Sequence, residues 1–166
     1  MAGEGNPVEM PEAPADRVKV VLEQVLLGLG LEGDVSTQED EESITATVEA
    51  RGEGDELGLL IGRHGQTIDA VQLLCFQAAF RGMRERKRVI VDAAGYRERR
   101  REALEARADR AAENALKEDR AIELEPMSAS ERRVVHEYLR EKPGIETYSE
   151  GDEPNRCVIV APLVHQ

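Results

Sequence analysis

The chain has 166 residues and a formal net charge of −12, with 40% hydrophobic and only 3% aromatic residues. This length accommodates two small domains, and without Trp their cores must consist of Val, Leu, Ile and Ala. No apolar run approaches the roughly 20 residues of a membrane helix, and the acidic N-terminus lacks the basic start and apolar middle of a signal peptide. We therefore expect a cytoplasmic protein without a membrane span.

The charge is distributed unevenly along the chain. Residues 1–58 contain 3 Lys/Arg and 15 Asp/Glu, whereas residues 81–110 contain 11 and 6. Phosphate contacts depend on the potential within a Debye length of about 8–10 Å. The basic middle can therefore bind a polyanion, while the acidic remainder should weaken indiscriminate binding.

The first elements follow from local patterns. Residues 1–15 are predicted to form a disordered acidic leader. A helix should begin near Asp16, a good N-cap residue, and end at Gly28 and Gly30. Apolar residues recur on one face of this helix, at Val18, Val21, Leu22, Val25, Leu26 and Leu29.

Two strands are expected next, at 33–39 and 43–51, with the acidic residues 39–42 at the hairpin tip. The second strand alternates apolar and polar residues, with Ile44, Ala46, Val48 and Ala50 on one face. A short helix over 55–61, a longer helix to about 82 and a strand at 89–91 complete an α-β-β-α-α-β order. The longer helix has two apolar stripes and should be largely buried; they are Ile68/Val71/Cys75/Ala78 and Leu73/Phe76/Phe80.

The motif Gly62-Arg63-His64-Gly65 joins the two later helices. Glycines let the backbone approach a ligand closely. The next helix directs its free N–H groups at the loop. Arg63 adds a positive charge, and His64 is a further hydrogen-bond donor. Ile61 and Ile68 beside the loop either form an apolar wall for bases or pack into the core. Alone, the motif is more typical of a tight turn between helices.

The position of this loop favours a role in nucleic-acid binding. The element order is that of a type II KH domain, whose GxxG loop clamps about four single-stranded nucleotides. Nucleic-acid-binding domains of the RRM and OB-fold types stack bases on aromatic side chains, and this sequence has almost no aromatic residues.

A second set of elements follows. A charged helix is expected over 96–117, a strand over 122–125, and a helix from Ser128, which forms an S-x-x-E capping box with Glu131. Strands at 145–149 and 156–161 should enclose a polar turn. The long helix has the apolar stripe Leu104, Ala108, Ala111, Ala112, Ala115 and Leu116, and the helix from Ser128 has the inner face Val134, Val135, Tyr138 and Leu139.

Arg132 and His136 lie one helical turn apart, and Arg140 continues the row. We expect the three side chains to face solvent together, where Arg offers a planar fork and His a further donor to phosphate. The alternative is an ordinary solvated helix face with a His that is capped by a neighbour. Arg97, Arg99, Arg100 and Arg101 at the start of the long helix are either a solvated linker face or a basic bridge between two binding surfaces, which would raise affinity through effective concentration.

Four segments in this order resemble the Jag (SpoIIIJ-associated) family over residues 16–164: LGLLIGRHGQTIDAVQLL, GYRERRREAL, ELEPMSASERRVVHEYL and ETYSEGDEPNRCVIV. The resemblance implies an αββααβ KH domain, single-stranded RNA binding and an R-three-H domain named for an Arg-x-x-x-His pair. Arg132 and His136 fall on that pair, and Arg156 matches a basic position of the last segment. It further implies pairing with a small KH-only protein and a role in cell elongation or envelope regulation. Many relatives carry an extra N-terminal domain, and functions that need it are not implied here.

We therefore predict an α+β chain with a leader (1–15), a type II KH-like domain (16–94) and an R-three-H domain that includes the long connecting helix (95–166). The predicted RNA contacts are Ile61, Gly62, Arg63, His64, Gly65, Ile68, Arg132, His136, Arg140 and Arg156, with Arg97, Arg100 and Arg101 as the basic bridge. We expect no catalytic group, cofactor or metal site, because the three His residues are scattered and no metal-ligand spacing occurs. A homodimer is compatible with the sequence. The alternatives are an acidic protein-interaction scaffold that docks another KH or ribosomal protein, and a nuclease.

Overall fold

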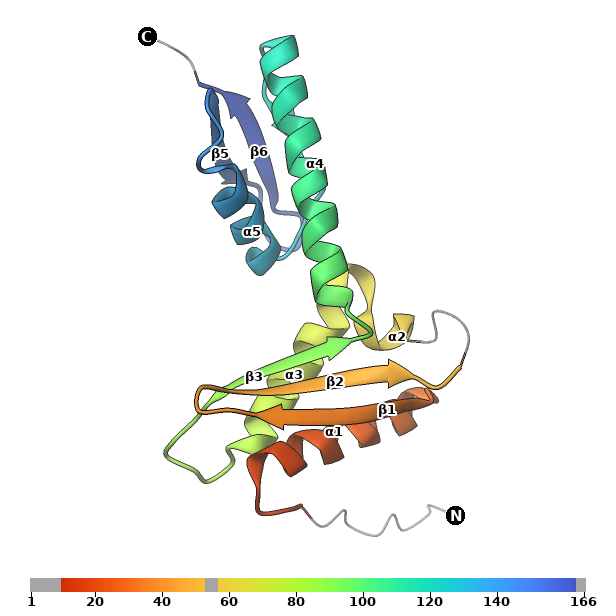
Figure 1. Cartoon of the computed structure of the whole chain (residues 1–166). Helices are drawn as coiled ribbons and strands as arrows, with labels where there is room; N and C mark the ends of the chain where they lie inside the picture. Colours follow the sequence, from red (N-terminus) through yellow and green to blue (C-terminus); the bar gives the residue numbers. More distant parts are fainter. Residues whose placement is uncertain (1–9, 53–56, 164–166) are drawn as a thin grey trace. The chain divides into compact units, whose positions relative to one another are not determined.

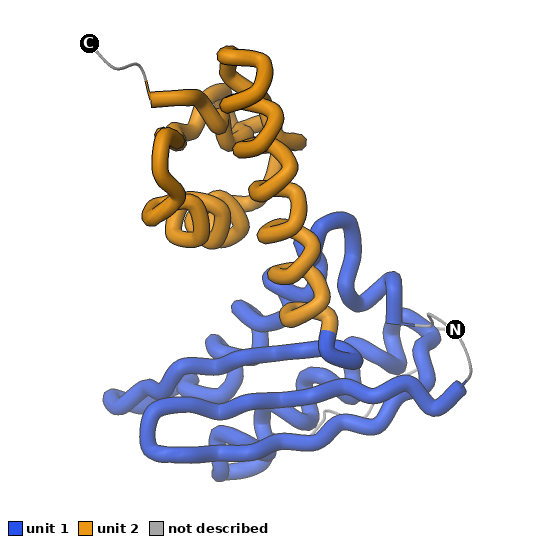
Figure 2. Tube along the Cα trace, turned by 45° about the horizontal axis from the view of Figure 1, so that its top comes forward, with its two compact units in different colours: residues 1–95 blue, residues 96–166 orange. Residues whose placement is uncertain are grey.

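The protein is described by a computed structural model that covers residues 10–52 and 57–163. The chain folds into two compact units, Met1–Gly95 and Tyr96–Gln166 (Figure 2). Each unit has its own three-stranded sheet. The sequence predicted the boundary between the units one residue earlier, between residues 94 and 95. None of the described helices combines the length and the apolar character needed to cross a bilayer.

The first unit has the element order αββααβ (Figure 1). Strand β1 pairs antiparallel with the central strand β2, and β3 pairs parallel with β2 on its other side. Helices α1 and α3 pack on each other, α1 also on β1 and α3 on β3. The elements are α1 (Pro14–Leu29), β1 (Gly33–Glu39), β2 (Ser43–Ala50), α2 (Gly58–Ile61), a 3₁₀ turn (Arg63–Gly65), α3 (Gln66–Ala79) and β3 (Arg88–Ala93).

The ends of α1 differ slightly from the prediction. The helix begins at Pro14, two residues before Asp16, because proline is favoured in the first helical turn, where its missing N–H costs nothing. Gly28 lies inside the helix, and Gly30 ends it in the left-handed conformation at φ +67°. The predicted leader up to residue 9 and the predicted start of the second helix at 55–56 lie outside the described residues.

The core of the first unit confirms three of the four residues of one predicted stripe of α3, with Ala78 only half-buried, and contradicts most of the other stripe. Phe80 is buried, but Leu73 is 59% exposed and Phe76 only half-buried, so the helix is not largely buried as predicted. The reason is that a helix lying on one face of a sheet buries only the stripe that faces the sheet. The buried residues of β2, which alternate along the strand, supply the opposing side of this core. The residues buried in this core include Val18, Leu22, Leu26, Ile44, Ala46, Val48, Ile68, Val71, Cys75, Val89 and Val91.

In the second unit, two helices pack on a sheet with strand order β4-β6-β5, in which both neighbouring pairs are antiparallel. The long helix α4 is part of this unit, because its small-residue stripe packs in the same core as α5 and β6. Leu116 departs from the predicted stripe and is 49% exposed. The elements are α4 (Tyr96–Glu118), β4 (Ile122–Glu123), α5 (Ala129–Leu139), β5 (Ile145–Glu150) and β6 (Cys157–Pro162).

Together the two units confirm the predicted α+β fold class, a type II KH-like unit followed by a small unit of helices and sheet. The predicted capping box is also present. The Ser128 side chain accepts a hydrogen bond from the Glu131 backbone N–H, and the Glu131 carboxylate accepts one from the Ser128 backbone N–H. Both cysteines are buried thiols, and desolvation raises the pKa of Cys75 to about 12, which keeps that thiol protonated and unreactive at neutral pH.

Candidate nucleic-acid interface

The GxxG loop has a backbone that only glycine accepts at its first position. Gly62 adopts φ +71° and ψ 180°, a region essentially restricted to glycine. Its N–H donates to the Gly58 carbonyl at 2.8 Å and ends α2. A Cβ at Gly62 would stand 2.7 Å from Thr67 Cβ and 2.9 Å from Thr67 N, and closer still to the Thr67 hydroxyl. The turn therefore depends on close packing between Gly62 and the first turn of α3.

The two residues between the glycines are accessible. Arg63 is exposed, and His64 is half-buried with a left-handed φ of +53°. No side chain caps the start of α3, and its N-cap is Gly65. An uncapped helix start offers backbone N–H groups and a positive dipole end to an anion. The carboxylate of Asp69 in the first turn partly offsets that attraction, so Arg63 is the main positive charge of the loop.

The apolar wall predicted beside the loop does not form. Ile68 is fully buried, and Ile61 is only 9% exposed. Both side chains pack in the core of the unit because α2 and the first turn of α3 direct their apolar faces inward. The alternative that Ile61 and Ile68 pack into the core is therefore correct. A base bound at the loop would find almost no exposed surface on either side chain.

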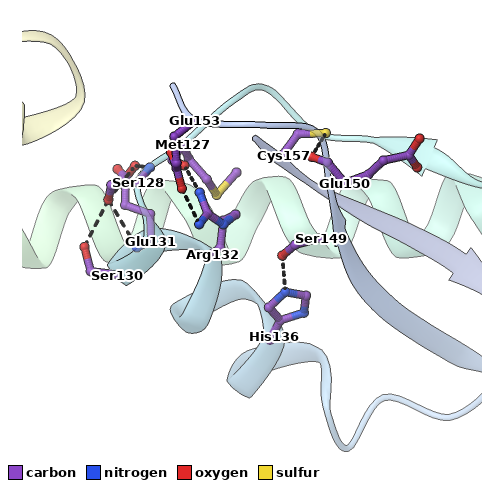
Figure 3. Close-up of polar contacts among 10 residues, drawn as sticks. All are labelled: Met127, Ser128, Ser130, Glu131, Arg132, His136, Ser149, Glu150, Glu153 and Cys157. Atoms are coloured by element: carbon purple, nitrogen blue, oxygen red, sulfur yellow. Dashed lines mark hydrogen bonds and ion pairs between the residues drawn. The ribbon is translucent and has the colours of Figure 1, made fainter. Parts of the chain in front are cut away.

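Arg132 is not on a solvent-facing row as predicted, since its side chain is only 10% exposed. One terminal nitrogen, Nη1, donates to the Met127 carbonyl at 2.8 Å, and the other, Nη2, donates to Glu153 Oε1 at 2.6 Å (Figure 3). The helix is rotated from the predicted orientation, and its buried face consists of Glu131, Arg132, Val135 and Leu139. Tyr138, predicted inside, is 41% exposed, and its hydroxyl donates to Asp109 at 2.7 Å.

His136 is held by two hydroxyl groups of β5. Nδ1 lies 2.7 Å from Thr147 Oγ1 and Nε2 lies 2.9 Å from Ser149 Oγ, the second contact being drawn in Figure 3. Burial of the ring, and then the nearby positive charge of Arg132, lower the pKa of His136 below its ordinary value of 6.5. The neutral ring donates from one nitrogen and accepts at the other, so neither nitrogen is available to phosphate unless a hydroxyl contact breaks.

This environment predicts that stability depends on pH through His136. Since the folded-state pKa lies below 6.5, the unfolded chain takes up the proton first as the pH falls. The stabilisation is therefore complete above pH 6.5 and is lost as the pH falls through 6.5 to the lower folded-state value. Unfolding free energies measured from pH 8 to pH 5 should decrease less in His136→Gln, which keeps polar contacts without titrating. Equal pH profiles of both proteins would contradict this assignment.

Two further basic residues of the second unit remain near the surface. Arg140 at the end of α5 is exposed. Arg156, which enters β6, is half-buried, and its Nε is enclosed without a hydrogen-bond partner among the described residues. A buried donor without a partner is uncommon in folded proteins.

The predicted basic bridge is largely engaged in pairs within its own unit. Arg100 forms an ion pair of 2.6 Å with Glu131, the capping residue of α5, and both side chains are mostly buried. Arg101 pairs with Glu98 at 2.5 Å and Glu105 at 3.2 Å on α4. Arg100 therefore joins α4 to the start of α5, which the sequence did not anticipate, and it is not part of an open basic surface.

The described residues hold no group of three or more His, Cys, Asp or Glu side chains arranged to bind a metal ion. Sequence analysis also missed the hydroxyl partners of His136. Thr147 and Ser149 alternate with exposed residues on β5 and share the face of the buried Ile145. This period of two is a signal for inward-facing hydroxyls that need a polar partner.

The fold and the two motifs define a protein with a KH domain followed by an R-three-H domain. Family models support both: a KH domain of the KhpA/KhpB type matches residues 19–92, and an R-three-H domain matches residues 102–162. Over 150 residues the chain is 35% identical to the RNA-binding protein KhpB of Clostridium symbiosum, covering 90% of this chain and 67% of that protein. The RNA-binding protein KhpB of Bacillus subtilis is likewise 35% identical, with 89% and 70% covered, and that of Streptococcus pneumoniae serotype 2 is 32% identical, with 90% and 44% covered. The chain belongs to the KhpB family, the Jag family that the sequence resembled.

Proposed function

We propose that this chain binds single-stranded RNA and acts in the cytoplasm as a regulatory protein without enzymatic activity. The observation that carries the proposal is the Gly62–Gly65 loop, whose glycine-only backbone brings the exposed Arg63 to the uncapped start of α3. Family membership supports it, because the similar proteins are named RNA-binding proteins. Contacts to the sugar–phosphate chain through Arg63, His64 and the loop backbone fit the lack of stacking aromatics.

The second unit is proposed to contribute a weaker contact. We assign this contact to Arg140, which is exposed, and to Arg156, which is half-buried, whereas Arg132 and His136 are held by partners within the unit. Two weak sites on one chain raise the apparent affinity through effective concentration. Pairing with a small KH-only protein or with a second copy, and a role in cell elongation or envelope regulation, are further proposals that rest on the family alone.

Binding should weaken steeply with salt. Each phosphate contact releases counterions, so the logarithm of affinity should fall linearly with the logarithm of salt, by about 0.7 per contact on a single strand. Fluorescence anisotropy with a labelled, unstructured oligoribonucleotide from 50 to 300 mM salt measures the slope, which we expect near −2 to −3 for three to four contacts. A duplex of the same sequence should compete poorly. Absence of binding at 50 mM salt would contradict the proposal.

The acidic residues of the first unit favour a second candidate, a scaffold that docks a basic protein. Residues 1–58 hold 15 Asp/Glu, and several, such as Glu41 and Glu49, are exposed. A stable protein complex that survives exhaustive RNase treatment, with no RNA affinity of the isolated chain, would favour the scaffold. The same labelled RNA should stay intact with Mg²⁺ or Mn²⁺, and cleavage would instead support a nuclease.

A further inference from the structure

The ion pair of Arg132 and Glu153 has one buried and one exposed member. The Arg132 side chain is 10% exposed and that of Glu153 is 60% exposed. The Met127 carbonyl fixes Nη1 of the guanidinium at 2.8 Å, and Nη2 then meets the Glu153 carboxylate at 2.6 Å. Figure 3 shows both contacts converging on the guanidinium from the segments before α5 and before β6.

Little in the described structure holds the Glu153 carboxylate apart from Arg132. Glu153 lies in the exposed turn between β5 and β6, which has a backbone hydrogen bond of 2.8 Å from Asn155 N–H to the Asp152 carbonyl. An ion pair with one solvent-exposed member contributes little to stability. A buried guanidinium left without any anion is costly, however, so Arg132 requires an anion at this position.

A phosphodiester oxygen can replace the carboxylate. The planar guanidinium donates to carboxylate and phosphate oxygens with the same geometry and at similar distances. The exposed partner can turn away into water without leaving a buried charge unpaired, provided that another anion arrives. The half-buried Arg156, three residues along the chain from Glu153, adds a further positive charge to this part of the second unit.

We infer that the Glu153 carboxylate occupies a phosphodiester subsite on Arg132, and that bound RNA displaces it. Glu153 is then a built-in competitor that lowers the affinity of the second unit for polyanions and limits indiscriminate binding. This inference rests on the proposed RNA-binding function and names the residue that restricts one of its contacts.

The test compares Glu153→Gln with Asp152→Asn by fluorescence anisotropy on the same single-stranded oligoribonucleotide at 0.1 M salt. Both variants remove one negative charge from the same exposed turn, but only Glu153 pairs with Arg132. Glu153→Gln should bind roughly three- to tenfold more tightly, and Asp152→Asn should stay within about twofold of the unmodified chain. In an Arg132→Gln background the gain from Glu153→Gln should vanish.

The outcomes separate the inference from the function on which it rests. If the unmodified chain binds RNA but Glu153→Gln binds equally or more weakly, the pair is purely structural and the inference is overturned. Equal gains in Glu153→Gln and Asp152→Asn would indicate a general charge effect and also overturn it. If neither the unmodified chain nor any variant binds, the proposed function itself fails. Should Arg132→Gln unfold, the NMR signal of the Arg132 Nε–H in the unmodified chain provides the second measurement: it should shift on RNA addition, and an unchanged signal opposes the inference.

Discussion

Replacing Gly62 by Ala should destabilise the first unit by about 2–6 kcal/mol. The backbone at φ +71° and ψ 180° costs an L-residue roughly 1–3 kcal/mol, and the new methyl would press on Thr67, whose Cβ lies 2.7 Å away, adding an overpacking cost of about 1–3 kcal/mol. Thr67 belongs to the first turn of α3, so relief of the clash must shift the helix that covers the sheet.

Hydrogen exchange of the β2 and α3 amides is the appropriate measurement, because the two units need not unfold together. The matched control is Gly28→Ala. Gly28 lies inside α1 with nothing within 4 Å of an added Cβ, and Ala is the better helix former by about 0.5–1 kcal/mol. We expect opposite signs for the two substitutions, and unchanged protection in Gly62→Ala would show that the loop backbone is not constrained as described.

The features that were predicted well from the sequence are those that depend on interactions between residues close together in the chain. The hairpin of β1 and β2 was placed within one residue, because β2 alternates strictly and Asp40 at the tip accepts hydrogen bonds from the N–H groups of Glu42 and Ser43. The capping box at Ser128 was predicted for the same reason, since both partners lie in one turn. Such signals do not depend on the rest of the fold.

The orientation of a helix about its own axis depends on the rest of the fold, and here prediction failed twice. In α5 the apolar residues alone indicated an inner face at Val134, Val135, Tyr138 and Leu139. The observed face is rotated toward Arg132 because this long side chain donates to the Met127 carbonyl and to the carboxylate of Glu153, while the Tyr138 hydroxyl donates to Asp109 on α4. None of these partners is a sequence neighbour on the helix face. In α3, the second failure, Leu73 lies on the exposed side of the helix, away from the sheet.

These differences separate the two candidate contact surfaces. The motif of the first unit presents an exposed arginine on a constrained backbone, whereas the motif of the second unit has its arginine paired with Glu153 and its histidine held by Thr147 and Ser149. A surface whose groups already have partners must exchange them to bind, and exchange reduces the net gain in free energy. The GxxG loop should therefore supply most of the affinity for a short RNA strand.

That ranking predicts that the double substitution Arg63→Asp with His64→Asp weakens RNA binding on the order of 30-fold, about 2 kcal/mol, the scale of a lost charged hydrogen bond. The double variant also places two negative charges where phosphates would pass. The fold should survive, because Arg63 is exposed and aspartate is among the residues that tolerate the left-handed φ of +53° at His64. Anisotropy at 0.1 M salt measures the loss, and circular dichroism confirms folding.

The control for this variant must carry the same charge change elsewhere on the first unit. Arg84→Asp with Gln77→Glu meets that condition, because both positions are exposed, both lie outside the loop, and the formal charge changes by the same amount when His64 is counted as neutral. A non-local electrostatic effect would lower the affinity of both variants alike, since it depends on total charge and distance. A contact at the loop lowers only the affinity of the Arg63/His64 variant, with the control within about threefold of the unmodified chain. Equal losses, or full affinity in both, would remove the glycine loop from the RNA-binding surface and leave the second unit to account for any binding that remains.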